Sequence, residues 1–172
     1  MKQLLCALAM LPLCGCVHIP DGVGAVEGFD AQRYLGRWYE IARFDHWFER
    51  GLINVSATYT QNEDGTIRVV NRGFDPAKET WKEAVGKARF AVTPDIGRLK
   101  VSFFGPFYGG YNIIELDQDY TYALVCGSDR SYLWILAREP QLPEEVIRTL
   151  NNRAKSLGFD TDTFIYVEHN TP

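Results

Sequence analysis

Short β-rich segments recur about every ten residues from Arg37 onward, and this spacing is the strongest constraint on the fold. The gaps between them carry Gly, Pro, Asp or Asn, which tight turns between antiparallel strands require. No helical pattern interrupts the series, so an antiparallel sandwich or barrel is favoured over an alternating α/β fold. The predicted strands are 37–44, 54–61, 66–72, 84–92, 98–104, 111–116, 121–126 and 132–138.

One amphipathic helix and a last strand are predicted after these eight segments. Pro143 fits the first turn of the helix, where a missing N–H costs nothing, and two glutamates follow it at the positive end of the helix dipole. Apolar residues then recur at helical spacing as far as Leu157, and Gly158 fits the position after the helix end. Residues 163–168 form a last strand that is apolar on both faces, which predicts that the helix or the barrel covers it.

An antiparallel barrel of eight strands has a lumen just wide enough for one small ligand. Alternation along the strands assigns one face to the lumen, and small residues there beside aromatic ones would leave space with apolar walls. A single bulge would reverse the assignment in its strand. The alternative is a lumen filled by side chains alone. The candidate lumen residues are Glu40, Val55, Ala57, Tyr59, Val69, Asn71, Phe90, Val101, Phe103, Asn112 and Trp134, with Ala84 and Ala88 as small residues on the same face.

Glu40 is the one acidic residue on an otherwise apolar predicted strand. If its side chain points inward, burial of the carboxylate is costly unless a polar residue pairs with it, and Arg43, Arg72 or Asn112 could do so. In that position it would recognise the head-group of a ligand. The alternative is an outward ion pair at the rim of the barrel.

Charge and motifs exclude several classes of function. The net charge is −4 and no run of basic residues occurs along the sequence, which argues against a nucleic-acid partner. The histidines His18, His46 and His169 lack metal-ligand spacing, so no metal site is expected. The Gly-rich stretch 21–28 follows no strand and opens no helix, so it does not predict a nucleotide site, and we expect no cofactor. No nucleophile elbow is visible, and no catalytic residue is assigned.

Two loops are rich in aromatic residues. Residues 44–48, Phe-Asp-His-Trp-Phe, follow the first strand and either cover an apolar ligand at the barrel mouth or simply pack across it. Residues 105–110, Gly-Pro-Phe-Tyr-Gly-Gly, are unusually glycine-rich for a hairpin. They form either a mobile loop with an aromatic tip, at the rim or at a dimer contact, or a turn with two packed rings.

The N-terminus has the pattern of an export signal. Lys2 precedes an apolar run from Leu4 to Leu13, which is too short for a membrane-spanning helix of about 20 residues. The sequence Leu-Cys-Gly-Cys at 13–16 resembles the lipobox of bacterial lipoproteins. That resemblance implies cleavage before Cys16 and its modification by an S-diacylglycerol and an N-palmitoyl group. The alternative is an ordinary cleaved signal with chance cysteines.

We therefore expect a lipoprotein signal peptide at 1–15, a flexible lipidated linker at 16–28 and a single domain at 29–172. Three acyl chains would anchor the domain to a membrane firmly. Cys126 would be the one thiol left in the domain, so no internal disulfide can form. Its apolar surroundings predict a buried structural cysteine rather than a reactive one.

Three short motifs resemble the signatures of the lipocalin family, in the correct order. They are Gly36-Arg-Trp38 at the first strand, Asp119-Tyr120 before the seventh and Arg138 after the eighth. The longer stretches 33–44 and 101–112 are similar to the bacterial outer-membrane lipoprotein lipocalins. This resemblance implies an all-β, eight-stranded up-and-down barrel with a C-terminal helix and a ninth strand. It also implies that Trp38 plugs the closed end and that Arg138 lies across its ring, a structural site.

The expected function is that of a membrane-anchored carrier without enzymatic activity. Apolar walls with few polar groups select acyl chains. The resemblance narrows the ligand to a fatty acid or lysophospholipid, for outer-membrane maintenance, and suggests a role under stress. It further implies an outer-membrane location facing the periplasm, and it suggests a homodimer. Two other classes stay open: an isomerase-type enzyme, which needs a titratable pair in the lumen, and a structural barrel with a filled lumen.

Overall fold

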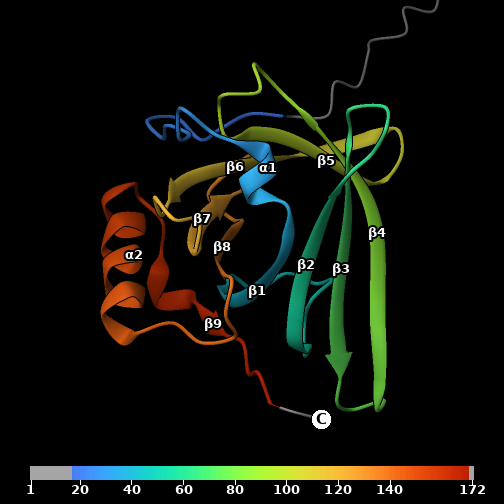
Figure 1. The fold of residues 1–172 in the computed structure, drawn as a ribbon. Helices are drawn as coiled ribbons and strands as arrows, with labels where there is room; N and C mark the ends of the chain where they lie inside the picture. Colours follow the sequence, from blue (N-terminus) through green and yellow to red (C-terminus); the bar gives the residue numbers. More distant parts are fainter. Residues whose placement is uncertain (1–16, 171–172) are drawn as a thin grey trace, which may run out of the picture.

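The computed structural model describes residues 17–170, so Cys16 and the expected signal peptide lie outside the described residues. Eight antiparallel strands form a barrel, a helix packs on its outside, and a short ninth strand extends the sheet (Figure 1). The strands are β1 (Gly36–Arg43), β2 (Ile53–Gln61), β3 (Ile67–Asp75), β4 (Thr80–Phe90), β5 (Arg98–Phe104), β6 (Phe107–Leu116), β7 (Tyr122–Cys126), β8 (Leu133–Ala137) and β9 (Ile165–Tyr166).

The barrel closes because β1 pairs with both β2 and β8. Sequential neighbours are hydrogen-bonded from β2 through to β8, and β1 then joins the two ends of the series. The predicted eight-stranded up-and-down barrel is therefore confirmed. β2, β3 and β4 lie side by side and extend well beyond β5 and β6 at one end of the barrel (Figure 1).

Helix α2 (Glu144–Ser156) lies against the wall that faces away from β2, β3 and β4 (Figure 1). Leu150 and Ala154, from its apolar stripe, are buried against the outer side of β6, β7 and β8. After a 3-10 turn at Thr161–Thr163, β9 pairs with the end of β1. The last strand is thus shorter than predicted, and its Ile165 and Tyr166 are exposed. The preceding Phe164 packs into the apolar layer between α2 and the outside of the barrel, which we call the outer core.

One end of the barrel is covered by a short helix that the sequence did not predict, α1 (Ala31–Tyr34). The Asp30 side chain accepts a hydrogen bond from the Gln32 backbone N–H and caps the helix N-terminus. A single turn is too short to show helical periodicity in the sequence. The opposite end carries the long loop between β1 and β2 and is the mouth of the barrel.

Residues 17–28 differ from the flexible spacer that their composition indicates. They lie along the outside of β5 and β6 as a strap, with Val23 buried in the outer core (Figure 1). Val26 exchanges backbone hydrogen bonds with Ile113 and Gly97, and Arg130 donates to the carbonyl oxygen of Asp21. The strap is therefore part of the folded domain. Within residues 17–170, the structure contains no helix of the length and apolarity needed to cross a membrane.

Candidate ligand-binding lumen

Trp38 and Arg138 close the end of the barrel beneath α1. The Trp38 side chain is 0% exposed, and its ring stacks on Tyr34 at 4.6 Å between centroids. The Arg138 guanidinium carbon lies 4.0 Å from the Trp38 ring centroid, a cation–π geometry. The same guanidinium donates to the backbone carbonyls of Arg33 and Arg37. Gly36 passes close to it at φ +94, so a side chain there would be strained.

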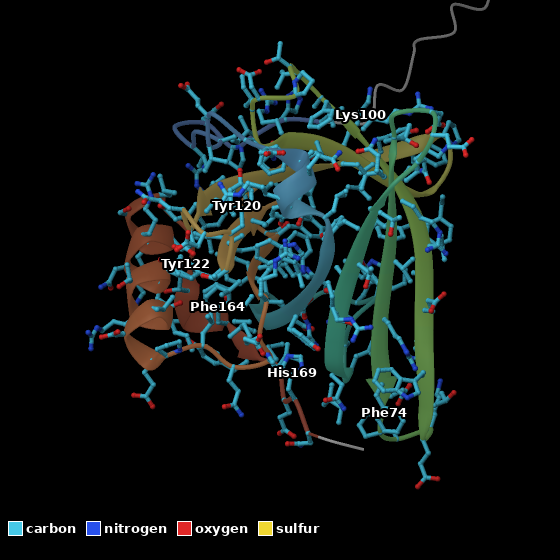
Figure 2. All side chains as sticks on the ribbon, viewed as in Figure 1. Phe74, Lys100, Tyr120, Tyr122, Phe164 and His169 are labelled. Carbon is cyan, nitrogen blue, oxygen red and sulfur yellow. The ribbon has the colours of Figure 1, made fainter. Side chains whose placement is uncertain are left out.

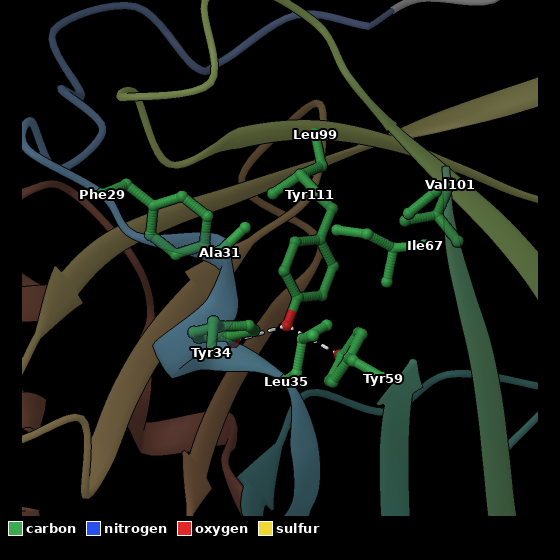
Figure 3. Close-up of a pocket in the computed structure, with 10 residues that line it drawn as sticks. Phe29, Ala31, Tyr34, Leu35, Tyr59, Ile67, Leu99, Val101 and Tyr111 are labelled. Carbon is green, nitrogen blue, oxygen red and sulfur yellow. Dashed lines mark hydrogen bonds between the residues drawn. The ribbon is translucent and has the colours of Figure 1, made fainter. Parts of the chain in front are cut away.

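Three tyrosines form the floor of the lumen above this plug. The Tyr111 hydroxyl hydrogen-bonds those of Tyr34 and Tyr59, at 2.7 and 2.8 Å (Figure 3). Burial raises the pKa of all three phenols, so they stay neutral. The enclosed hollow beside them measures about 10 Å³, room for about one water molecule. A hydrocarbon chain would therefore have to lie between this floor and the mouth.

The inner wall between floor and mouth is apolar and partly open to solvent. Ladder pairing places Ala57 opposite Asn71, and Asn71 opposite Ala84, so all three face inward with the buried Val69. Ala84 is exposed although it faces the lumen, which shows that solvent reaches this part of the wall. The inward residues that are partly buried are Ala57, Asn71, Phe90, Val101, Phe103 and Trp134, and those that are buried are Glu40, Val55, Tyr59 and Val69.

Asn112 does not line the lumen, so the prediction that it faces inward is wrong. Its neighbours Tyr111 and Ile113 pack among the apolar side chains inside the barrel. Side chains alternate between the two faces of a strand, so Asn112 points to the outside. Its amide donates to the carbonyl of His18, at 3.0 Å, and to that of Gly127, at 2.9 Å. Asn112 therefore fastens the N-terminal strap to the barrel wall.

Glu40 points into the lumen rather than outward, and its role in head-group recognition stays a prediction. Its carboxyl accepts a hydrogen bond from Arg43 at 3.1 Å, and the Arg43 side chain is 2% exposed. A regular strand would turn residues 40 and 43 to opposite faces, but a bulge between Glu40 and Ala42 brings them to the same one. Of the three partners considered, Arg43 is the one found.

Glu49 completes this polar cluster, and the sequence pattern did not identify it. It lies in the loop between β1 and β2, where its side chain lies near the Glu40 carboxyl and accepts a hydrogen bond from the Trp134 indole at 3.3 Å. Arg43 donates to its backbone carbonyl at 2.8 Å. Burial and the neighbouring Glu49 raise the pKa of Glu40, and burial raises the pKa of Glu49. One arginine, Arg43, therefore faces two buried carboxyl groups whose protonated forms are favoured by burial.

The loop between β1 and β2 folds over this cluster and partly covers the mouth. His46 is buried and stacks on Tyr132 at 4.9 Å, while Trp47 beside it is 76% exposed. Burial, together with the positive charge of Arg43, lowers the pKa of His46 to about 4. Arg43 Nε and His46 Nε2 are buried without a hydrogen-bond partner. The loop thus buries His46 and Glu49 and exposes Trp47 together with the Asp45–Arg50 ion pair.

Residues 17–170 contain no cluster of three or more His, Cys, Asp or Glu side chains that could hold a metal. Cys126 is buried in the outer core, and burial raises the pKa of its thiol to about 12. A thiol in that state is not a nucleophile at neutral pH.

Residues 29–169 match the family described as Lipocalin-like domain. The chain belongs to the lipocalin family. The outer membrane lipoprotein Blc of Escherichia coli (strain K12) is 52% identical over 94% of this lipocalin and 92% of its own length. The protein of the same name from Vibrio cholerae is 46% identical, over 98% and 99% of the two chains. These relatives place this lipocalin at the outer membrane as a lipid-anchored protein.

Solved structures support the fold at much lower identity. Insecticyanin from the tobacco hornworm Manduca sexta superimposes with a TM-score of 0.70 at 19% identity, over 89% of this lipocalin and 87% of insecticyanin. The allergen Per a 4 from cockroaches gives a TM-score of 0.68 at 19% identity, over 86% and 92% of the chains. At this identity the likeness concerns the barrel alone.

Proposed function

We propose that this lipocalin binds a fatty acid or a lysophospholipid without chemical conversion, for maintenance of the outer membrane. The observation that carries the proposal is the inner wall: an apolar surface reached by solvent, which ends at a buried polar cluster around Arg43. Apolar walls favour an acyl chain through desolvation, and a few polar groups near the mouth fix the head-group. Arg43 Nε, which has no hydrogen-bond partner, supplies an N–H donor for such a head-group.

Native mass spectrometry of the protein extracted from membranes tests this proposal. Ala57→Trp fills the inner wall, whereas Thr58→Trp adds the same ring to the adjacent residue on the outer face of β2. We expect a co-purifying lipid with the parent chain and with Thr58→Trp, and its loss in Ala57→Trp. A folded parent chain that never carries lipid, with a tightly packed lumen, would instead support a structural barrel.

The anchor is the second part of the proposal. We propose that Cys16 carries the S-diacylglycerol and N-palmitoyl groups and holds the domain on the periplasmic side of the outer membrane. Cys16→Ser should move the protein from the membrane fraction to the soluble fraction, and the mass of the N-terminal peptide should lose its acyl groups. Retention of Cys16→Ser in membranes would contradict this assignment. A homodimer and a role under stress stay predictions, which sedimentation and expression measurements can test.

An isomerase-type enzyme is the second candidate, because the lumen does contain a titratable pair. Glu40 and Glu49 are neighbours at the mouth, and burial raises the pKa of both carboxyl groups, as a proton-transfer site requires. Incubation of the purified protein with the lipids that it carries, followed by mass analysis, separates the two functions. An isomerised product that disappears in Glu49→Gln would favour catalysis over carriage.

A further inference from the structure

The N-terminal strap determines where an anchor can lie. The carbonyl of Val17 accepts a hydrogen bond from Arg98 on β5 at 3.3 Å, and that of His18 accepts from Asn112 on β6. Val17, the residue that follows Cys16 in the sequence, is thus held on this face. If Cys16 carries acyl groups, the anchor is attached one residue away from the outer side of β5 and β6.

The outer face of the neighbouring strands is basic. Arg68 lies opposite Lys87, and Arg89 opposite Lys100, so two pairs of like charges are cross-strand neighbours. Asp64 forms an ion pair with Lys87 at 3.3 Å. In a chain of net charge −4, this concentration of cations next to the strap matches an anionic surface. Lys100 lies on the side of the molecule where the described chain begins (Figure 2).

The turn between β5 and β6 adds an apolar component to this face. Phe104 is 76% exposed and Phe107 is 67% exposed, and these two residues pair across the turn. Exposed aromatic rings beside basic residues are the combination that inserts into the head-group region of a bilayer. The turn thus projects apolar rings from the edge of the basic face.

We infer that the outer face of β4 and β5, with the Phe104–Phe107 turn, docks onto the surface of an anionic bilayer. The inference rests on the lipid anchor of the proposed function, since the strap holds Val17, the residue after Cys16, at this face. Docking would also bring the lumen close to the lipids. The part of β4 that pairs with β5 is Lys87–Phe90. Among the described residues, residues 80–86 of β4, which include the inward-facing Ala84, pair with β3 on one side and have no partner strand on the other.

Fluorescence quenching by brominated lipids tests the docking face in the full-length, lipidated protein. A dye is attached to Phe107→Cys or, as a control, to Trp47→Cys on the loop between β1 and β2; Cys126 is buried and does not compete. In vesicles of phosphatidylcholine with phosphatidylglycerol, we expect strong quenching at 107 and little at 47. Equal quenching at both positions, or none at 107, would overturn the inference.

Charge variants test the basic face separately. Arg89→Gln with Lys100→Gln removes two cations from the face, and Arg148→Gln with Lys155→Gln removes two from α2. Each cation near an anionic surface contributes about 1 kcal/mol, so the first pair should lower the docked-to-undocked ratio roughly thirtyfold in unlipidated Cys16→Ser protein mixed with anionic vesicles. An equal effect of both pairs would refute a specific basic face.

A second copy of the chain is the competing occupant. In that case the dye at 107 would be shielded but insensitive to brominated lipid, and cross-linking through the turn would yield dimers, which would overturn membrane docking. Failure of the proposed function is a separate result. It would appear as missing acyl groups in the N-terminal peptide or as a protein without bound lipid, whatever the quenching shows.

Discussion

Replacement of Trp38 by alanine tests whether the closed end of the barrel is a structural plug. The Trp38 side chain is fully buried, stacks on Tyr34, lies beneath Arg138 and donates from its indole N–H to the Tyr34 carbonyl at 2.8 Å. Loss of a buried Trp side chain costs about 3–5 kcal/mol, of which the cation–π contact accounts for about 0.5–2. In a domain of this size, the melting temperature should fall by roughly 6–20 °C.

Calorimetry or urea unfolding of three variants measures this cost. Trp38→Phe keeps a ring under Arg138, so its free energy of unfolding should fall by less than that of Trp38→Ala. Trp47→Ala removes the same side chain from an exposed position and should change the free energy of unfolding by less than about 0.5 kcal/mol. If Trp38→Ala and Trp47→Ala melt at the same temperature, the plug does not stabilise the barrel and the reasoning is refuted.

Three further predictions concern the mouth and the strap. Because the pKa of His46 falls from 6.5 to about 4 in the folded state, the stability present above pH 6.5 should decline as the pH falls toward 4, and His46→Phe should reduce this decline in urea unfolding. The pKa of Glu40 is raised above 4.5, so the stability that it contributes at low pH should be lost as the pH rises through the folded value; Glu40→Gln, which keeps the polar contact, should lessen that loss. Asn112→Leu leaves the His18 and Gly127 carbonyls without this donor and should cost about 1–3 kcal/mol and speed proteolysis of the strap, whereas the exposed Asn152→Leu should do neither.

The barrel could be predicted from the sequence because turn residues and alternation are local signals. The second strand, expected at 54–61, is found at Ile53–Gln61, and the helix occupies Glu144–Ser156 between its predicted start and end. The fourth strand begins earlier than expected, at Thr80, because the hairpin before it is tighter: Glu79 adopts a positive φ and turns the chain. Such boundaries depend on backbone conformation at single residues.

The polar cluster at the mouth could be predicted only in part. Glu40 stood out as an acid on an apolar strand, but its pairing with Arg43 depends on a bulge that no residue pattern reveals. Glu49 reaches the lumen because its loop folds inward, a tertiary effect. Asn112 was assigned to the wrong face, although its neighbours Tyr111 and Ile113 give the correct alternation. Side-chain direction is the information that short motifs lack.

The packed N-terminal strap has a consequence for how cargo could travel. A domain joined to its anchor by a long loose tail could swing across the periplasm and meet a second membrane. Here the strap is fastened to the barrel wall by hydrogen bonds from Asn112 and Arg98, so it does not act as a loose tether. A barrel held in this way would stay at one leaflet of the membrane. Transfer of its lipid would then require the acceptor protein or membrane to approach the barrel.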